Sequence, residues 1–378
     1  MFDRIIIGCG FAGAVLGREL AEKGNKVLIV EQRNHIGGNA YDMLDEHGIL
    51  IHKYGPHIFH TNIKKVYEYL SQFTQWYEYF HEVVGNIYGE LLPIPFNLNT
   101  LNCVYKEEKA ARLKDKLLAV YGENEKVPIL ELRDNEDPEI REIAEYIYEN
   151  IFLKYTMKQW GQTPEEIDPT VSGRVPIVLS YDNRYFQDTY QGLPKEGYTK
   201  LFEAMLDHEN IEVRLNTTAD KEIQIRDQQL YFEGHLFEGE LIFTGALDEF
   251  FQCRFGQLPY RSLIFQTEYY ETKPYQSHGV VNYTVTEDFT RITEYPYLTG
   301  QNTQGTTIMK EYPIPYTGTN GEIPYYAIIN PDNLALYQKY VSLVKEIPNF
   351  HLLGRLAEYK YYNIDAIVKR ALDLAKEM

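Results

Sequence analysis

A glycine-rich stretch near the start of the chain, Gly8-Cys9-Gly10-Phe11-Ala12-Gly13, decides the fold. The apolar run 3–7 before it predicts a buried strand, and the residues after it predict a helix that ends near Lys23. A second apolar strand over 26–30 then leads directly to Glu31. This order of strand, turn, helix and strand predicts a Rossmann-type βαβ unit that binds a dinucleotide, rather than a glycine-rich turn without a ligand.

Each glycine of this turn has a physical role in such a site. Gly8 allows the tight turn, Gly10 lets a pyrophosphate approach the backbone, and Gly13 lets the helix pack against the strand. The free N–H groups at the helix start hold the pyrophosphate, and Glu31 accepts hydrogen bonds from ribose hydroxyls. Because a carboxylate disfavours a 2′-phosphate at that position, we expect NAD or FAD.

A second glycine pair follows the acidic residue, in Arg33-Asn34-His35-Ile36-Gly37-Gly38-Asn39. This pair resembles the extended fingerprint of FAD proteins in the amine oxidase and dissociation-inhibitor group, whereas NAD dehydrogenases normally lack it. We therefore expect FAD rather than NAD. We expect it to be bound non-covalently, because the fingerprint lacks a flavin-linking cysteine.

The composition narrows the classes of function. The chain has 378 residues, and its 37 basic and 55 acidic residues give a formal charge of −18, which disfavours binding to a nucleic-acid backbone. Three cysteines without regular spacing indicate neither a disulfide framework nor a metal site. No apolar run is long enough to span a membrane, and the motif that begins at Gly8 leaves no room for a signal peptide. We expect a cytoplasmic protein without membrane insertion.

The rest of the chain predicts two further regions. Helical spacing over 66–79, 106–121 and 138–160 indicates a mostly helical insertion. From residue 181 onward, short strands rich in Tyr, Thr, Val and Ile recur between polar turns, which predicts an antiparallel sheet. These strands are expected at 212–215, 262–268, 280–285, 290–294 and 306–310.

The predicted fold class is α/β: a split, Rossmann-like FAD-binding domain with an inserted helical domain and an antiparallel β-sheet substrate domain. Apolar strands at 241–245 and 351–355 return to the first sheet, and a helix over 363–375 closes the chain. The expected domains are the FAD-binding domain at 1–65, 197–250 and 350–378, the helical domain at 66–165, and the sheet domain at 166–196 and 251–349.

More particular motifs follow one another along the whole chain. The longest is His52-Lys53-Tyr54-Gly55-Pro56-His57-Ile58-Phe59-His60-Thr61. The others lie at 154–161, 174–176, 182–186, 190–194, 197–200, 260–263, 290–294, 310–312 and 354–361. Any one of them could arise by chance, but together and in this order they are specific. They resemble the motifs of the bacterial UDP-galactopyranose mutases.

The resemblance implies an isomerase that acts as a homodimer and interconverts UDP-galactopyranose and UDP-galactofuranose for surface glycan biosynthesis. In this family reduced FAD is the active form: its N5 attacks the anomeric carbon and displaces UDP, and the sugar ring opens and recloses without net redox change. A cofactor-based reaction agrees with the absence of GxSxG, HExxH and a lone activated cysteine from the sequence.

The resemblance also assigns residues to the site. Arg174 and Arg291 are expected to hold the diphosphate, since a leaving group with two negative charges needs forked donors, and His60 is expected to approach the flavin as a third catalytic residue. The substrate-binding residues are His81, Phe152, Tyr155, Thr156, Trp160, Arg174, Tyr185, Asn282, Arg291, Tyr312 and Tyr361. The cofactor-binding residues are Gly8, Gly10, Phe11, Gly13, Glu31, Gln32, Gly38, Asn39, His57, Ile58, Arg355, Tyr362, Asn363 and Ile364, and no metal ligands are expected.

Several of these residues have structural alternatives. Tyr155 and Trp160, which are expected to face the uracil ring, could instead be core aromatics of a helix, and His57 and His60 could be held by backbone groups. Asn363 replaces an aspartate of many family members. Asparagine can still cap the helix that follows, but a role that needs negative charge is in doubt.

Two other functions share parts of this pattern. One is an FAD-dependent oxidase or desaturase of the amine-oxidase group, which would consume an electron acceptor. The other is a non-catalytic, dissociation-inhibitor-like scaffold, which would have no reason to keep a complete FAD fingerprint. Within the mutase interpretation, N-acetylated and arabinose-based UDP-sugars stay open as substrates.

Overall fold

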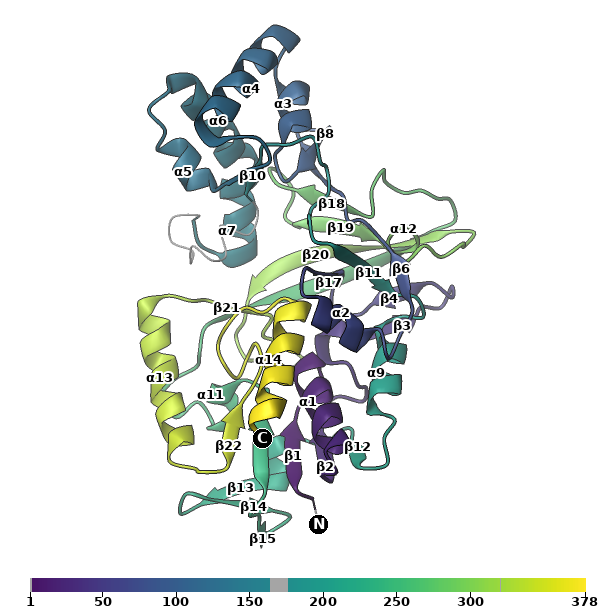
Figure 1. Cartoon of the computed structure of the whole chain (residues 1–378), viewed down its shortest axis with the longest axis vertical. Helices are drawn as coiled ribbons and strands as arrows, with labels where there is room; N and C mark the ends of the chain where they lie inside the picture. Colours follow the sequence, from purple (N-terminus) through teal and green to yellow (C-terminus); the bar gives the residue numbers. More distant parts are fainter. Residues whose placement is uncertain (1, 164–175, 320) are drawn as a thin grey trace. The chain divides into compact units, whose positions relative to one another are not determined.

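The chain forms two compact units (Figure 1). The structure, a computed structural model, describes residues 2–163, 176–319 and 321–378. Unit 1 comprises Met1–Glu78, Asp188–Tyr260 and Pro324–Met378, and unit 2 comprises Tyr79–Gln187 and Arg261–Ile323. Most of the helical insertion and of the substrate sheet, which the sequence suggests are two domains, therefore lies in one unit.

Unit 1 contains a five-stranded parallel sheet in the order β12-β2-β1-β16-β22. In its register Ile6 lies between Ile29 and Ile242, and all three side chains are fully buried. Continuous apolar runs of this kind are typical of parallel strands that are covered on both faces. The strands are β1 (Arg4–Ile7), β2 (Val27–Val30), β12 (Ile211–Arg214), β16 (Glu240–Phe243) and β22 (Phe350–Leu352).

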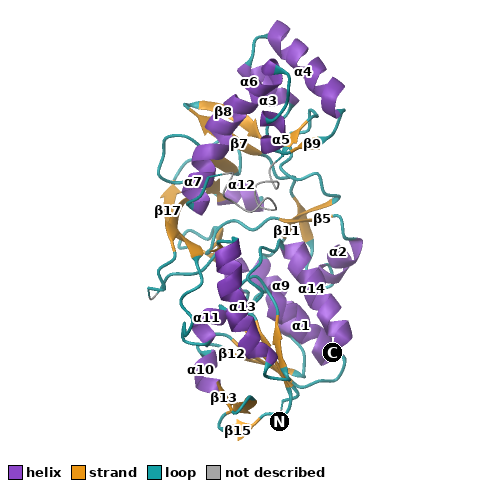
Figure 2. Ribbon diagram, turned by 90° about the vertical axis from the view of Figure 1, so that its left-hand side faces the viewer, coloured by secondary structure: helices purple, strands orange, loops and turns teal. Residues whose placement is uncertain are grey.

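The first helix packs on this sheet and is itself covered by two further helices. The helix α1 (Phe11–Glu22) packs against α9 (Tyr198–Leu206) and α14 (Ile364–Glu377), and α1 and α14 lie side by side in Figure 1 and in Figure 2. The prediction that 212–215 joins the antiparallel sheet is wrong. The strand β12 runs parallel to β2, because α9 carries the chain back along the sheet before β12 begins.

The helix predicted over 66–79 is shorter than expected. It ends at Leu70, and a strand, β6 (Trp76–Glu78), follows. Trp76 stacks on Phe59 with ring centroids 4.7 Å apart, and β6 pairs with β11 (Tyr190–Pro194), so tertiary pairing overrides the helical spacing. The other elements of unit 1 are η1 (Gly38–Ala40), β3 (Asp42–Leu44), β4 (Leu50–His52), β5 (Phe59–Thr61), α2 (Lys64–Leu70), α10 (Ala219–Glu222), β13 (Ile223–Arg226), β14 (Gln229–Phe232), β15 (His235–Leu236), α11 (Leu247–Phe250), β21 (Tyr326–Ala327) and α13 (Pro331–Lys345).

Unit 2 is built on a mixed sheet, with a row of strands in the order β17-β20-β19-β18-β7-β8. The predicted antiparallel strands are present, but β7 and β8 come from the segment predicted to be helical, and β7 runs parallel to β18. These strands are β7 (Val83–Ile87), β8 (Glu90–Ile94), β17 (Tyr260–Tyr270), β18 (Val280–Tyr283), β19 (Arg291–Glu294) and β20 (Thr306–Pro315).

The helices of unit 2 share one hydrophobic core with this sheet. Val83 and Ile87 of β7 belong to the same buried cluster as Ile140 and Ile143 of α6, which explains why helices and sheet form one unit. The helix predicted over 138–160 is present, with a π-helical segment in its middle. The remaining elements are α3 (Leu98–Val104), α4 (Glu107–Tyr121), β9 (Lys126–Val127), α5 (Ile129–Arg133), α6 (Pro138–Ile147), the π-helix η2 (Tyr148–Leu153), α7 (Lys154–Trp160), β10 (Ile177–Val178) and α12 (Tyr295–Thr299).

None of the helices in the described ranges is both long enough and apolar enough to cross a membrane.

A buried carboxyl in unit 1 makes stability depend on pH. Asp248 is fully buried; its Oδ2 accepts a hydrogen bond from the Leu258 N–H at 2.8 Å, and its Oδ1 has no partner among the described residues. Burial raises the pKa of Asp248 to about 6, so the folded state binds this proton more tightly than the unfolded state. The free energy of unfolding should therefore fall as pH rises from about 4 to about 6.

Replacing Asp248 with asparagine should remove this loss of stability. We expect Asp248→Asn to raise the free energy of unfolding at neutral pH by roughly 2–3 kcal/mol and to have much less effect near pH 4. Denaturant unfolding of both proteins at the two pH values measures the difference. An equal difference at both pH values would contradict the proposed ionisation.

Candidate active site

The glycine turn between β1 and α1 is shaped by close backbone contacts. Gly8 has a φ of +103°, and a Cβ there would overlap the Thr244 hydroxyl. A Cβ at Gly13 would overlap the Gly8 carbonyl oxygen. Both glycines are therefore needed by the protein itself, because only glycine permits this turn and the close approach of α1.

Gly10 is different, because the space beside it is open. It precedes Phe11 as the N-cap of α1 and makes no side-chain cap, so the first N–H groups of the helix have no capping oxygen from that residue. A Cβ at Gly10 would meet only Gly38 Cα, at 3.8 Å, among the described residues. A Cβ at Gly38 would approach Gly10 Cα to 2.9 Å. The two glycines leave a cradle beside a helix N-terminus, which suits a pyrophosphate.

Glu31 is held at the end of β2 by backbone donors. Its carboxylate is 5% exposed and accepts hydrogen bonds from Cys9 N at 2.9 Å and from Arg33 N at 3.0 Å. Burial raises the pKa of the Cys9 thiol to about 12, so Cys9 is a neutral, small residue of the turn. The carboxylate is therefore oriented before any ribose binds.

Arg33 is a candidate cofactor residue that the sequence reasoning missed. One terminal nitrogen donates to Asn39 Oδ1 at 2.9 Å, and its guanidinium lies 4.5 Å from the centroid of the Tyr54 ring. The other terminal nitrogen, Nη1, is buried without a hydrogen-bond partner among the described residues. A buried, unsatisfied donor in this position fits an oxygen-rich ligand. Its place two residues after the ribose-binding acid was the available signal.

The segment after β22 reaches the same turn from the other end of the chain. Gly354 has a φ of +108°, and a Cβ there would lie 3.3 Å from Ala12 Cβ in α1. Arg355 donates to the Tyr362 carbonyl at 2.6 Å and lies 4.5 Å from the centroid of the Tyr361 ring. The N-terminal glycine turn and the segment around Arg355, which the sequence assigns to one cofactor site, thus lie close together in unit 1.

Asn363 and Tyr361 lie in the segment that leads into α14. Asn363 occupies the N-cap position of α14, before Ile364, but its side chain makes no capping hydrogen bond, so the capping role is not supported. The first-turn N–H of Ala366 is instead bonded by Asp365 Oδ1 at 2.7 Å. Tyr361 stacks on Tyr326, a tyrosine that the sequence reasoning missed, with ring centroids 6.1 Å apart.

The histidines of the long motif are held in different ways. His52 is buried and neutral, since burial lowers its pKa to about 3, and its Nδ1 accepts a hydrogen bond from His57 N at 3.0 Å. His57 Nδ1 lies 2.8 Å from the Gly55 carbonyl, which agrees with the structural alternative for this residue. Ile58 follows as a partly buried residue, and Gln32 is exposed.

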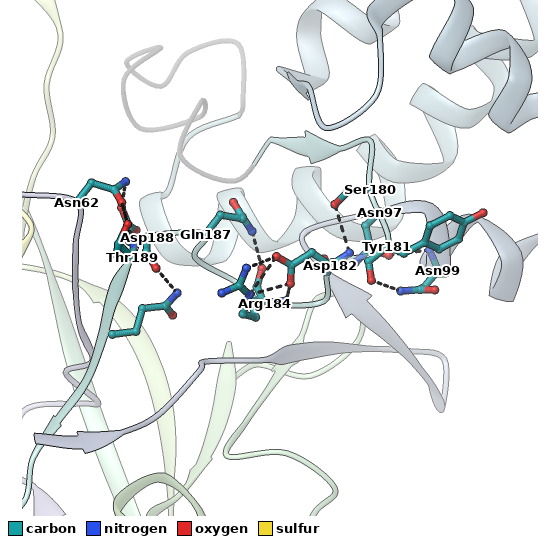
Figure 3. A network of polar contacts seen from close by, with 11 residues as sticks. Asn62, Asn97, Asn99, Ser180, Tyr181, Asp182, Arg184, Gln187, Asp188 and Thr189 are labelled. Atoms are coloured by element: carbon teal, nitrogen blue, oxygen red, sulfur yellow. Dashed lines mark hydrogen bonds and ion pairs between the residues drawn. The ribbon is translucent and has the colours of Figure 1, made fainter.

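His60 belongs to a side-chain network rather than a backbone contact. Its Nδ1 lies 2.8 Å from Asp188 Oδ2. Asp188 Oδ1 in turn accepts a hydrogen bond from Asn62 Nδ2 at 2.7 Å (Figure 3). A carboxylate at Nδ1 fixes the orientation and tautomer of an imidazole. Asp188 and Asn62 were missed, because they lie outside the motifs and far from each other in the sequence.

In unit 2, α7 carries the residues expected to bind the base. Thr156 is buried, Tyr155 and Trp160 are partly buried, and Phe152 lies in the preceding π-helix as part of the hydrophobic core. The C-terminal end of α7 is bonded by Arg261 of β17, which donates to the carbonyls of Lys158 at 2.9 Å and Gln159 at 3.1 Å. The helix is therefore fastened to the sheet at its last turn.

Three polar residues form a row across the neighbouring strands β18, β19 and β20. In the register Asn282 lies opposite Arg291, and Arg291 lies opposite Glu311. Arg291 makes a forked ion pair with Glu311, with both Nε–Oε2 and Nη2–Oε1 distances at 2.8 Å. Glu311 is 1% exposed, so the pair fixes the plane of the guanidinium. The sequence reasoning gave Glu311 no role, although it lies inside a motif.

Tyr312 does not share this face of the sheet. It follows Glu311 directly in β20, and successive side chains of a strand point to opposite faces. Its hydroxyl lies 3.4 Å from Gln266 Oε1. The structure thus brings Asn282 and Arg291 together but separates Tyr312 from them, because the residues alternate along the strand.

A polar network holds the loop that carries Tyr185. Asn97 donates to the Asp182 carbonyl at 3.2 Å, Asn99 donates to the Tyr181 carbonyl at 2.9 Å, and Asp182 forms a forked pair with Arg184 (Figure 3). Tyr185 N donates to the His81 carbonyl at 2.6 Å, and the two rings lie 5.7 Å apart. His81 is buried, and its carbonyl holds the backbone of Tyr185 in place. Arg174, the other predicted diphosphate ligand, lies outside the described residues.

Unit 1 is therefore built like a dinucleotide-binding protein of the Rossmann class, and the comparisons with known proteins agree. A profile described as "NAD(P)-binding Rossmann-like domain" matches residues 6–73. The predicted α/β fold class with a Rossmann-like domain is confirmed.

A second profile, described as "UDP-galactopyranose mutase", matches residues 150–361. The "Probable UDP-galactopyranose mutase" of Klebsiella pneumoniae is 36% identical over 99% of this chain and 94% of its own length. The "UDP-galactopyranose mutase" of Mycoplasma pneumoniae is 35% identical over 100% of this chain and 96% of its own length. The chain belongs to the UDP-galactopyranose mutase family and is an enzyme of the isomerase class.

Two further comparisons add to this assignment. A "dTDP-fucopyranose mutase" of Escherichia coli is 36% identical over 98% of this chain and 97% of its own length. A solved structure titled "Crystal structure of reduced UDP-Galactopyranose mutase" aligns with a TM-score of 0.71 at 16% identity, covering 100% of this chain and 93% of that one. The structural likeness supports the fold.

Proposed function

We propose that this enzyme interconverts UDP-galactopyranose and UDP-galactofuranose with reduced FAD as its cofactor. Beyond membership of the family, the observation that carries the proposal is the row of Asn282, Arg291 and Glu311 on unit 2. It presents an oriented guanidinium beside an amide. Such a pair suits the diphosphate and a neighbouring hydroxyl of a nucleotide-sugar.

Unit 1 has the features that FAD requires. The cradle at Gly10 and Gly38 would hold the pyrophosphate, Glu31 would hold ribose hydroxyls, and the buried Arg33 Nη1 would find an acceptor on the same ligand. Bound in its reduced form, FAD supplies a nucleophile at N5 and returns unchanged after each turnover. The protein supplies binding, orientation and charge.

Arg291 has a defined task in this reaction. Negative charge develops on UDP as it leaves the sugar, and a forked cation placed beforehand stabilises that charge. Because Glu311 already balances one positive charge, a dianionic leaving group would need a further cation, and we assign this role to Arg174 as the sequence suggests. We also assign His60 to the flavin, with Asp188 holding its Nδ1–H.

A second candidate substrate has support of its own. The relative called "dTDP-fucopyranose mutase" is as similar to this chain as the Klebsiella protein, at 36% identity each. The same ring contraction on a dTDP-6-deoxysugar would use the same cofactor and diphosphate contacts. Comparing turnover of UDP-galactofuranose with that of dTDP-fucofuranose separates the two functions.

The proposal also covers the use of the product, the location of the enzyme and its oligomeric state. We assign the product to surface glycan biosynthesis and the active form to a cytoplasmic homodimer. Sedimentation of the purified protein measures the oligomeric state directly.

The proposal predicts activity that requires the reduced flavin but does not consume it. Enzyme incubated with UDP-galactofuranose should form UDP-galactopyranose in the presence of dithionite and form almost none when the flavin is oxidised. Starting and final sugars have the same oxidation level, so one reduction should support many turnovers. Chromatography of the products and a count of the reductant check this. One equivalent of reductant or acceptor used for each product would place the enzyme among the oxidases instead.

A further inference from the structure

The side chain of Lys158 on α7 reaches the turn between β18 and β19. Its ammonium donates to the carbonyls of Tyr283 at 2.5 Å, Glu287 at 3.0 Å and Phe289 at 3.3 Å. An ammonium has three donors, so these three carbonyls use its full capacity. Lys158 thus closes the turn and ties it to α7.

The charge of Lys158 is partly removed from solvent and depends on the turn carbonyls. Lys158 is only partly exposed, and burial lowers its pKa, with Glu287 and Asp288 opposing that change. A buried cation is stable only when its hydrogen bonds are satisfied, and the turn carbonyls satisfy them here. A neutral, apolar side chain would leave those carbonyls without their donor.

The two segments that Lys158 joins carry different parts of the candidate nucleotide site. On one side, Tyr155 and Trp160 lie on the same short helix as Lys158. On the other side, Asn282 directly precedes Tyr283, and Arg291 begins β19 just after the turn. Lys158 therefore links this helix directly to the turn between β18 and β19, while Arg261 holds the same helix from β17.

We propose that Lys158 is a positioning residue that holds the aromatic face of α7 at the distance from Asn282 and Arg291 that one intact nucleotide spans. The inference rests on the proposed function, because it takes α7 as the base site and the strands as the diphosphate site. Each half-site would still bind its own fragment without Lys158. Only a ligand that joins the two fragments would lose affinity, because the halves would no longer be held in register.

The test compares UDP with its two parts, uridine and inorganic pyrophosphate, by calorimetric titration. In Lys158→Met we expect UDP binding to weaken roughly tenfold, while uridine and pyrophosphate each change by less than about threefold. The KM for the sugar nucleotide should rise by a similar factor, with a smaller change in kcat. Lys158→Gln, which keeps amide donors without the charge, should recover part of the UDP affinity.

The control is Lys154→Met, which removes an exposed lysine from the same helix and should change none of these values. Flavin content and circular dichroism check that each variant is folded, and Lys158→Gln replaces Lys158→Met if the latter is unfolded.

Unchanged UDP affinity in the folded variant would overturn the proposal. Equal weakening of pyrophosphate would show a direct phosphate contact, and equal weakening of uridine would show local damage to α7; either would also overturn it. Failure of the wild-type enzyme to bind UDP would reject the substrate class as well.

Discussion

Replacing Arg291 with alanine should lower kcat/KM by at least about a hundredfold, because the residue would stabilise charge that develops on the leaving UDP. Its guanidinium is fixed by the two 2.8 Å contacts with Glu311 and lies opposite Asn282 in the register. Losing a charge-assisted hydrogen bond to the diphosphate costs about 1.5–3 kcal/mol, which corresponds to roughly ten- to a hundredfold. The loss beyond this amount, which comes from the charge that develops on UDP, should appear in kcat.

The alanine variant also leaves Glu311 buried without its partner, which destabilises the fold. Arg291→Lys therefore provides the sharper measurement: it keeps a cation beside Glu311 but lacks the fork, so we expect a folded enzyme with a loss of at least about tenfold in kcat. The matched control is Arg112→Ala on α4, where an exposed arginine pairs with Glu139 in the same unit. Full turnover in Arg291→Lys and Arg291→Ala would remove Arg291 from the reaction.

Replacing Gly10 with alanine should abolish most FAD binding and leave the apoprotein folded. The only described atom near the added Cβ would be Gly38 Cα, at 3.8 Å, an ordinary contact distance, and the backbone at Gly10 is extended. The methyl group would occupy the space that a pyrophosphate needs at the start of α1. We expect an affinity loss on the order of a hundredfold, which is the size of the loss of about one charge-assisted hydrogen bond to the pyrophosphate.

Gly13→Ala gives the contrast, because its Cβ would overlap the Gly8 carbonyl and separate α1 from β1. That variant should lose stability even without FAD, whereas Gly10→Ala should keep the melting temperature of the wild-type apoprotein. The ratio of FAD to protein, measured after denaturation releases the flavin, gives the binding result. Normal FAD content in Gly10→Ala would show that the pyrophosphate does not lie at this glycine.

The cofactor turn was predictable because its requirements are local. The turn needs a backbone φ near +100° at Gly8, open space beside Gly10 and an acid at the end of the next strand. Each requirement selects a particular residue type at a fixed spacing, which can be recognised in the sequence. The same reasoning found the strands β1, β2 and β16, since buried parallel strands form continuous apolar runs. The family motifs located α7 and β19 in the same way, through residues within a few positions of each other.

The sequence by itself thus determined the dinucleotide turn, the α/β class and the family to which the chain belongs. Only the tertiary structure decided that Glu311 pairs with Arg291, that Tyr312 points to the other face, and that Asp188 holds His60. It also decided that β7 joins the sheet beside β18 and shares a core with α6. The physical reason is that strand register and long-range side-chain pairs depend on segments far apart in the chain, and no local spacing records which of them will meet.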